Sequence, residues 1–237
     1  MYSKIISRTL FLSFAYCNLS LAQVAIETPT IYTFTGPKLG AQSVFDIVTT
    51  TVNGNIFKTV ESQSIIETSD DGFATERDIK TASGLQSNTT LIFSNKAAQR
   101  LKTTIKLPHG GENVCIYKPH GGGAPANLQL GQSWDFDFSE TCSNKAEVKL
   151  RNQGVLTAIE PITVPAGTFM AYKFQSITTG VTASGMKVTG TNTFWRNADV
   201  AVTGTRILRE EVHYEYAGKL PIDENVVSYI RTLKSYH

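Results

Sequence analysis

The sequence predicts an all-β protein with at most a few short helical turns. We expect a large curved antiparallel meander sheet, half-barrel or barrel-like in shape. Two observations support this class: apolar and polar residues alternate with a period of two over most of the chain, and glycine, asparagine and proline turn signals separate the alternating runs. Roughly 10–12 strands are expected, and a sheet of that size must curl or close.

The first strands are expected at Ile31–Gly36, Ser43–Thr51 and Asn55–Ser64. The pair Asn53-Gly54 lies between two β-rich runs, and both of its residues tolerate positive φ, which makes it a strong hairpin signal. Phe73–Lys80 is polar and charged, which is typical of an edge strand that resists pairing with another molecule.

The middle of the chain is less regular. Thr90–Ser94 and Thr103–Leu107 alternate as strands do, and Asn95–Lys102 has the apolar spacing of a short helical turn. Pro108–Gly131 contains two glycine clusters and three prolines, so we expect a long irregular excursion there.

Clear alternation returns at Ser133–Ser139, where three aromatic residues share one face. A hairpin is expected from Glu147–Arg151 to Val155–Ile159 through the turn Asn152-Gln153-Gly154. The aromatic residues on one face of Ser133–Ser139 are Trp134, Phe136 and Phe138.

A second hairpin is predicted around Pro165. Val164 precedes this proline and is therefore pushed towards extended geometry, while Gly167 can take the positive φ that a turn requires. Met170, Tyr172 and Phe174 then share one face of the following strand. Further strands are expected at Thr191–Arg196, Arg206–Tyr216 and Asn225–Tyr236, the last of which also fits a helix stripe but is rich in β-branched residues.

The N-terminus has the pattern of a secretory signal peptide. Residues 1–22 carry two basic residues, a short apolar stretch and the cleavage sequence Ser20-Leu21-Ala22, so we expect cleavage after Ala22 and a single β-rich domain over residues 23–237. An N-terminal membrane anchor and lipidation at Cys17 are the alternatives. The prediction places the protein in the periplasm or outside the cell.

Charge limits the partners of this domain. Loss of residues 1–22 removes Lys4 and Arg8 and no acidic residue, which leaves 20 basic and 20 acidic side chains. A chain without net charge has no general electrostatic field for nucleic acid, so no nucleic-acid partner is expected. No later segment approaches the roughly 20 apolar residues of a membrane span.

Two cysteines remain after Cys17 is removed. Cys115 and Cys142 form an even pair in an exported chain, so we expect a disulfide, worth on the order of 3–4 kcal/mol through loop entropy. Two buried thiols, or half of a zinc site with His109 and His120, are the alternatives, although no Cys-x-x-Cys spacing supports zinc.

Three segments together resemble a family. They are Leu128–Trp134, Ile162–Phe169 with its Val-Pro-Ala-Gly-Thr-Phe run, and Thr193-Phe194-Trp195. They resemble exported bacterial proteins of unknown function that are similar in fold to periplasmic lipoprotein carriers. In such carriers a curved antiparallel sheet surrounds an apolar cavity that shelters acyl chains. The resemblance therefore implies lipid binding, and it supplies no catalytic residue.

Seven aromatic residues are candidates for the lining of an apolar ligand cavity. They are Phe45, Trp134, Phe136, Phe138, Tyr172, Phe174 and Trp195. The alternative is that they fill a core. Aromatic residues on one face of a strand bury large apolar areas both in a core and around a ligand, so the pattern does not separate the two roles. A curved sheet without covering helices must bury its concave face, and a bound ligand is one way to do so.

No catalytic, metal or cofactor site is predicted. His120-Gly121-Gly122-Gly123 could form an esterase oxyanion hole, but the Gly-x-Ser-x-Gly elbow is missing from the chain. Asp135 and Asp137 lie on one face of a strand, which favours a solvated outer surface over a glycosidase pair. His213, between Glu211 and Glu215, is expected on a solvated strand face rather than in a metal site.

These observations favour a non-enzymatic binding module of the cell envelope for an apolar, lipid-like ligand. A structural or protein-interaction module with a filled core is the alternative, and an envelope hydrolase is third. The sequence names neither the ligand nor a protein partner.

Overall fold

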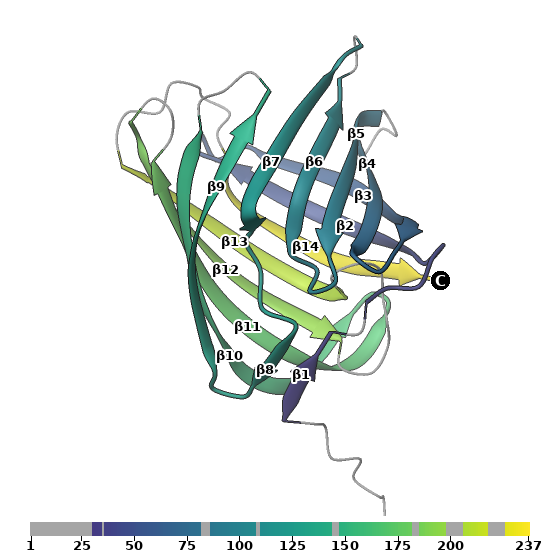
Figure 1. Cartoon of the computed structure of the whole chain (residues 1–237). Coiled ribbons are helices and arrows are strands. Elements are labelled where there is room, and N and C mark those ends of the chain that lie inside the picture. The colour runs from purple at the N-terminus through teal and green to yellow at the C-terminus, as the bar shows by residue number, and fades with distance from the viewer. Residues whose placement is uncertain are drawn as a thin grey trace, which may run out of the picture.

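The computed structural model describes residues 30–34, 36–81, 86–107, 110–143, 147–181, 185–197, 206–217 and 226–237. The predicted signal peptide, residues 1–22, lies outside the described residues. All regular structure among them is β-strand, as the sequence predicted. Twelve strands form one closed antiparallel barrel, and two short strands form a separate pair (Figure 1).

The strand order around the barrel is β10-β11-β12-β13-β14-β2-β3-β4-β5-β6-β7-β9. Nearly all neighbours are consecutive in the chain, which is the expected meander. Closure pairs β14 with β2 and leaves no free edge in the barrel. The barrel strands are β2 (Gln42–Thr51), β3 (Ile56–Thr68), β4 (Gly72–Thr81), β5 (Gln86–Asn95), β6 (Arg100–Lys106), β7 (Glu112–Gly121), β9 (Ser133–Cys142), β10 (Val148–Val164), β11 (Gly167–Val181), β12 (Lys187–Asn197), β13 (Ile207–Ala217) and β14 (Val226–Tyr236).

The remaining pair, β1 (Ile31–Thr33) and β8 (Asn127–Gln129), closes one end of the barrel. In Figure 1 this pair lies at the lower end, beneath β10 and β11. Tyr32 and Leu128 are fully buried there against side chains that face inward from the barrel wall. The Tyr172 hydroxyl on β11 donates a hydrogen bond to the Ile31 carbonyl, which ties the pair to the wall.

Both predicted hairpin turns with strong signals are present. Thr51 and Ile56 flank the Asn53-Gly54 turn, in which Gly54 takes a φ of 77°. Val164 pairs with Gly167 across Pro165-Ala166, and the tip of this hairpin reaches β14 through a hydrogen bond from the Ala166 N–H to the Leu233 carbonyl. The Val-Pro-Ala-Gly-Thr-Phe run therefore packs a long hairpin onto its own barrel.

Four expectations are corrected. Asn95–Lys102 holds a tight turn and the start of β6 instead of a helical turn, because Asn95 caps the turn through its side chain. The region of Pro108–Gly131 is not one long excursion, since Glu112–Gly121 is a barrel strand. No turn interrupts β10 at Asn152-Gln153-Gly154; Gly154 instead makes room for the Trp134 indole.

The fourth correction concerns Phe73–Lys80. This segment lies in β4, which is paired on both sides, and Arg77 points into the barrel rather than to an exposed edge. Arg77 forms an ion pair with Glu61 in the interior. Of the ambiguous segment Asn225–Tyr236, the described residues Val226–Tyr236 form strand β14, which closes the barrel.

Candidate functional site

The closed end of the barrel has an aromatic floor. Phe174 stacks on Phe194 with ring centroids 4.9 Å apart, and Tyr32 meets the Phe174 ring edge-on at 5.0 Å. Tyr172 also packs edge-on against Tyr32, at 5.2 Å. These rings come from β11, β12 and β1, so the floor joins the wall to the strand pair below it.

Above this floor the barrel encloses a lumen of about 740 Å³ that is partly open to solvent. This volume lies within the range of roughly 300–1,000 Å³ that is usual for small-molecule sites. The lining is mixed. Besides apolar residues such as Ile47, Ile92 and Phe138 it includes seven charged side chains: Glu61, Arg77, Arg100, Glu140, Arg196, Glu210 and Arg231. The inner surface is therefore not the uniformly apolar one that the sequence suggested.

Four of these charges form a connected ion-pair network. Arg231 contacts Glu61 at 2.6 Å and Glu210 at 3.7 Å, and Arg77 contacts Glu61 at 3.7 Å. Amide groups complete the network, since Gln63 donates to Glu61 and Asn192 donates to Glu210, both at 2.9 Å. Two arginines and two glutamates balance, so this group can stay ionised inside the barrel.

Tyr117 links two further charges. The Arg100 guanidinium lies over the Tyr117 ring at 5.5 Å and reaches its hydroxyl at 3.5 Å, and that hydroxyl donates to Glu140 at 3.4 Å. Desolvation acts to lower the pKa of Arg100, but attraction to Tyr117 and Glu210 outweighs it, so the pKa is raised. Arg100 lines the lumen and is exposed to solvent, because the lumen is partly open.

Arg196 differs from the other lumen arginines. Its guanidinium lies within 5.5 Å of the ring centres of Tyr32, Phe174 and Phe194. Nη1 donates to the Tyr32 hydroxyl at 2.8 Å, while the buried Nε has no acceptor among the described residues. Only 3% of the residue is exposed, and it forms no ion pair with a carboxylate in the part of the chain that the structure describes.

Tyrosine hydroxyls occupy the lumen wall on β13 and β14. Burial raises the pKa of Tyr229 well above its usual value, with repulsion by the Glu210 carboxylate as the next cause. Burial and Glu210 also raise the pKa of Tyr214. Both phenols therefore stay protonated at neutral pH and can donate hydrogen bonds to a ligand.

The seven aromatic candidates divide between the floor, a second buried cluster and the lumen. Trp134, Tyr172 and Phe174 belong to the buried cluster that forms the floor, and Phe136 packs against it. Phe45 and Trp195 belong to a second cluster with the β10–β11 hairpin tip. Phe138 is the candidate whose side chain lines the lumen.

Hydrogen bonds fix the two indoles at these places. Trp134 Nε1 donates to Asn152 at 2.7 Å, and Trp195 Nε1 donates to Glu160 at 2.8 Å. Lys173 lies over the Trp195 ring and pairs with Glu160 at 3.3 Å. The Trp195 hydrogen bond is the main cause of the lowered pKa of Glu160.

The predicted disulfide is confirmed. Cys115 on β7 and Cys142 on β9 are directly paired across the two strands and are bonded at 2.04 Å. Glu140 Oε1 lies 3.3 Å from Cys142 Sγ. Because both sulfurs are in the disulfide, this group of two cysteines and a glutamate offers no thiolate to a metal.

The other predicted polar residues lie as follows. Asp135 and Asp137 are exposed on the outer face of β9, as expected, and Asp135 forms a double hydrogen bond with Arg151. His213 is exposed on β13. His120 packs edge-on against Phe136 with centroids 4.6 Å apart, and burial lowers its pKa. His109 lies outside the described residues.

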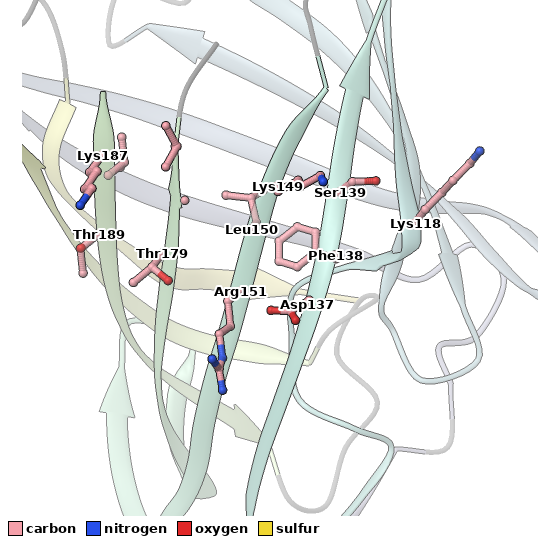
Figure 2. A pocket seen from close by; sticks show the side chains of 13 residues that line it. Lys118, Asp137, Phe138, Ser139, Lys149, Leu150, Arg151, Thr179, Lys187 and Thr189 are labelled. Atoms are coloured by element: carbon pink, nitrogen blue, oxygen red, sulfur yellow. The ribbon is translucent and has the colours of Figure 1, made fainter. Parts of the chain in front are cut away.

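A second cavity, on β7 and β9–β12, is a basic groove (Figure 2). Lys118, Lys149, Arg151 and Lys187 line it together with the single carboxylate of Asp137. The groove and the lumen share Phe138 and Leu150 as lining residues. Gly180 lets the Leu150 side chain lie across its backbone, because an added Cβ would come within 2.3 Å of Leu150 Cδ2.

Among the described residues, no helix has the length and apolar character needed to cross a membrane.

The fold has known relatives among solved structures. A candidate exported protein with a YmcC-like fold from Bacteroides fragilis matches with a TM-score of 0.52 and 11% identity. A candidate lipoprotein from Parabacteroides distasonis matches with a TM-score of 0.50 and 18% identity. Each match covers 87% of this chain and 99% of the other.

The hypothetical lipoprotein YmcC from Escherichia coli matches more weakly, with a TM-score of 0.42 and 12% identity over 83% of this chain and 84% of the other. No protein-family model matches the chain, and no curated protein matches it. At these identities the first two matches establish a shared barrel fold.

Sequence reasoning missed the charged lining of the lumen. Glu61 and Gln63 alternate with outward-facing Val60 and Ser62, so polar residues occupy both faces of β3 and the pattern does not identify the inner one. For Arg196, the neighbouring Phe194-Trp195 pair indicated a buried strand end. An arginine at a buried strand end is unusual, and this could have marked Arg196 as a candidate functional residue from the sequence.

Proposed function

We propose that the protein is a non-enzymatic binding module of the cell envelope whose barrel lumen holds a lipid-like amphiphile. The observation that carries this proposal is the lumen itself: it has the volume of a small-molecule site, a closed aromatic floor and access from solvent. The signal-peptide pattern of residues 1–22 and the names of the matched exported protein and lipoprotein support an envelope location.

The mixed lining favours an amphiphile over a purely apolar ligand. Apolar patches such as Ile47, Ile92 and Phe138 can cover an acyl chain. A wholly apolar ligand would strip water from the nearby charges without replacing their hydrogen bonds, which is costly. A ligand with one polar end and one apolar end satisfies both kinds of surface.

The first test is to purify the protein from an envelope fraction and examine it by native mass spectrometry with lipid extraction. We expect a co-purifying amphiphile, and we expect a fluorescent fatty acid to bind with a 1:1 stoichiometry. No co-purifying lipid together with no binding of the fatty acid would refute the proposal and would favour a structural or protein-interaction module.

A variant that fills the lumen tests where the ligand binds. Thr178 faces the lumen from β11, whereas Gln175 is exposed on the outer face of the same strand. Thr178→Trp should weaken binding of the fluorescent fatty acid at least tenfold, and Gln175→Trp should leave it unchanged. Equal effects of the two substitutions would mean that the fatty acid binds outside the lumen.

A further inference from the structure

The balance of charge inside the lumen leaves one cation over. Arg77, Glu61, Arg231 and Glu210 neutralise one another in one ion-pair network. Arg100 and Glu140 have opposite charges and share the Tyr117 hydroxyl. Of the seven charged lining residues this leaves Arg196 without a carboxylate partner in the described structure.

An unbalanced arginine at this position is costly for the fold. Arg196 is nearly fully buried, and water can reach little of its guanidinium. The aromatic rings around it stabilise the cation through their faces, but they supply no counter-charge. Its Nε has no hydrogen-bond acceptor in the part of the chain that the structure describes. An uncompensated buried charge of this kind destabilises a fold, so a partner brought by a ligand would relieve a real penalty.

The space beside Arg196 is kept open by glycines. Gly121, Gly122 and Gly123 line the lumen, and a Cβ added at Gly123 would meet Arg196 Nη2 at 4.0 Å and no other atom. Gly122 and Gly123 take φ values of 41° and 99°, which side chains disfavour. Their backbone N–H groups make no hydrogen bond with the described residues. Unpaired N–H groups of a glycine run beside a guanidinium are typical of an anion site.

We propose that Arg196 and the glycine run Gly121–Gly123 form a subsite at the lumen floor for a carboxylate or phosphate group of the ligand. A guanidinium binds either oxyanion through charge-assisted hydrogen bonds. This inference rests on the proposed function and deepens it, because it makes the amphiphile an acidic one. It also gives a role to the His-Gly-Gly-Gly sequence, which needs no catalytic serine when the glycines only bind an anion.

The test compares four probes by displacement of a fluorescent fatty acid and by calorimetry: decanoate, decyl phosphate, 1-decanol and inorganic phosphate. We expect the two acidic amphiphiles to bind at least tenfold more tightly than 1-decanol, a difference of about 1.4 kcal/mol. Arg196→Gln should abolish this preference, and Arg196→Lys should keep part of it because the charge remains. Arg151→Gln, on the outer surface, is the matched control and should leave the affinities of the four probes unchanged.

A second measurement avoids dependence on the folding of Arg196→Gln. In the unsubstituted protein, raising the salt concentration should weaken decanoate binding relative to 1-decanol binding, because salt screens the charge interaction and acts alike on the apolar chains of the two ligands. Equal affinity for decanoate and 1-decanol, or equal salt dependence of the two, would refute the subsite while the proposed function survives.

The remaining outcomes separate the two proposals. Binding of inorganic phosphate that is lost in Arg196→Gln, with no binding of either amphiphile, would support the subsite and refute the lipid-like ligand. No binding of any of the four probes would refute both.

Discussion

The floor and the lumen belong to one barrel but are built on opposite principles. The floor is a buried cluster of stacked rings from β1, β11 and β12, with the Arg196 guanidinium against these rings. The lumen is partly open to solvent and carries ion pairs across β3, β4, β13 and β14. The comparison indicates that stability is concentrated at one end and that the capacity to bind is kept at the other.

The largest effect is expected from the floor. Phe174 is fully buried, and its substitution by Ala removes a ring that contacts Phe194, Tyr32 and Trp134. Loss of a buried phenylalanine typically costs about 3–5 kcal/mol in the free energy of unfolding. Urea unfolding of Phe174→Ala would measure it. Gln175→Ala, on the outer face of the same strand, is the control. A loss below about 1 kcal/mol for Phe174→Ala would contradict a stabilising floor.

The disulfide should rank next, since it ties β7 to β9 in the wall. Replacing Cys115 and Cys142 together by alanine should lower the free energy of unfolding by about 3 kcal/mol, because the unfolded chain loses a cross-link. The free energy would be measured with and without reductant. A reductant that destabilises the double variant as much as the unsubstituted protein would contradict this interpretation.

A smaller effect is expected from the charged lumen. Glu61 accepts from Gln63 and pairs with Arg231 and Arg77, so Glu61→Gln leaves two arginines with one fewer counter-charge. We expect a loss of about 2 kcal/mol in the free energy of unfolding, which is less than a fully enclosed pair would give because the lumen is partly open to solvent.

Chemical denaturation would again measure this loss, with Glu67→Gln at the exposed end of the same strand as the control. A loss as large as that of Phe174→Ala would show that the lumen contributes to stability as the floor does, and would end the contrast between the two regions.

The smallest effect on stability is expected from the Asp135–Arg151 pair on the outer face of the barrel. The hydrogen bonds from Arg151 hold the pKa of Asp135 in the folded protein below its usual value. The pair therefore stabilises the fold fully at a pH above the usual pKa of an aspartate. This stabilisation is lost as the pH falls through the lowered pKa of the folded protein. Arg151→Gln should return the pKa of Asp135 towards its ordinary value. NMR titration of the Asp135 carboxyl would detect the change, and the midpoint of urea unfolding at neutral pH should scarcely move. An unchanged pKa would mean that the pair does not persist in solution.

Particular residues show how far sequence patterns reach. Asn53-Gly54 and Pro165-Ala166 predicted their hairpins because turn geometry depends on a few neighbouring residues. The turn predicted at Asn152-Gln153-Gly154 was wrong, because the same glycine serves a close approach of Trp134 between two strands. A glycine marks the site in each case. Only the residue across the sheet distinguished a glycine in a turn from a glycine that accommodates a neighbouring side chain.

The sequence by itself determined that the chain forms an antiparallel meander, where most strands lie, and that Cys115 and Cys142 belong together, because alternation, turn residues and cysteine pairing act over short distances or within few choices. The tertiary structure alone decided that β14 closes on β2, that one face of β3 carries Glu61 into a lumen, and that Arg196 stays without a carboxylate partner among the described residues. These features depend on which strands become neighbours after closure, and residues such as Glu61 and Arg231, 170 positions apart, carry no local mark of their meeting.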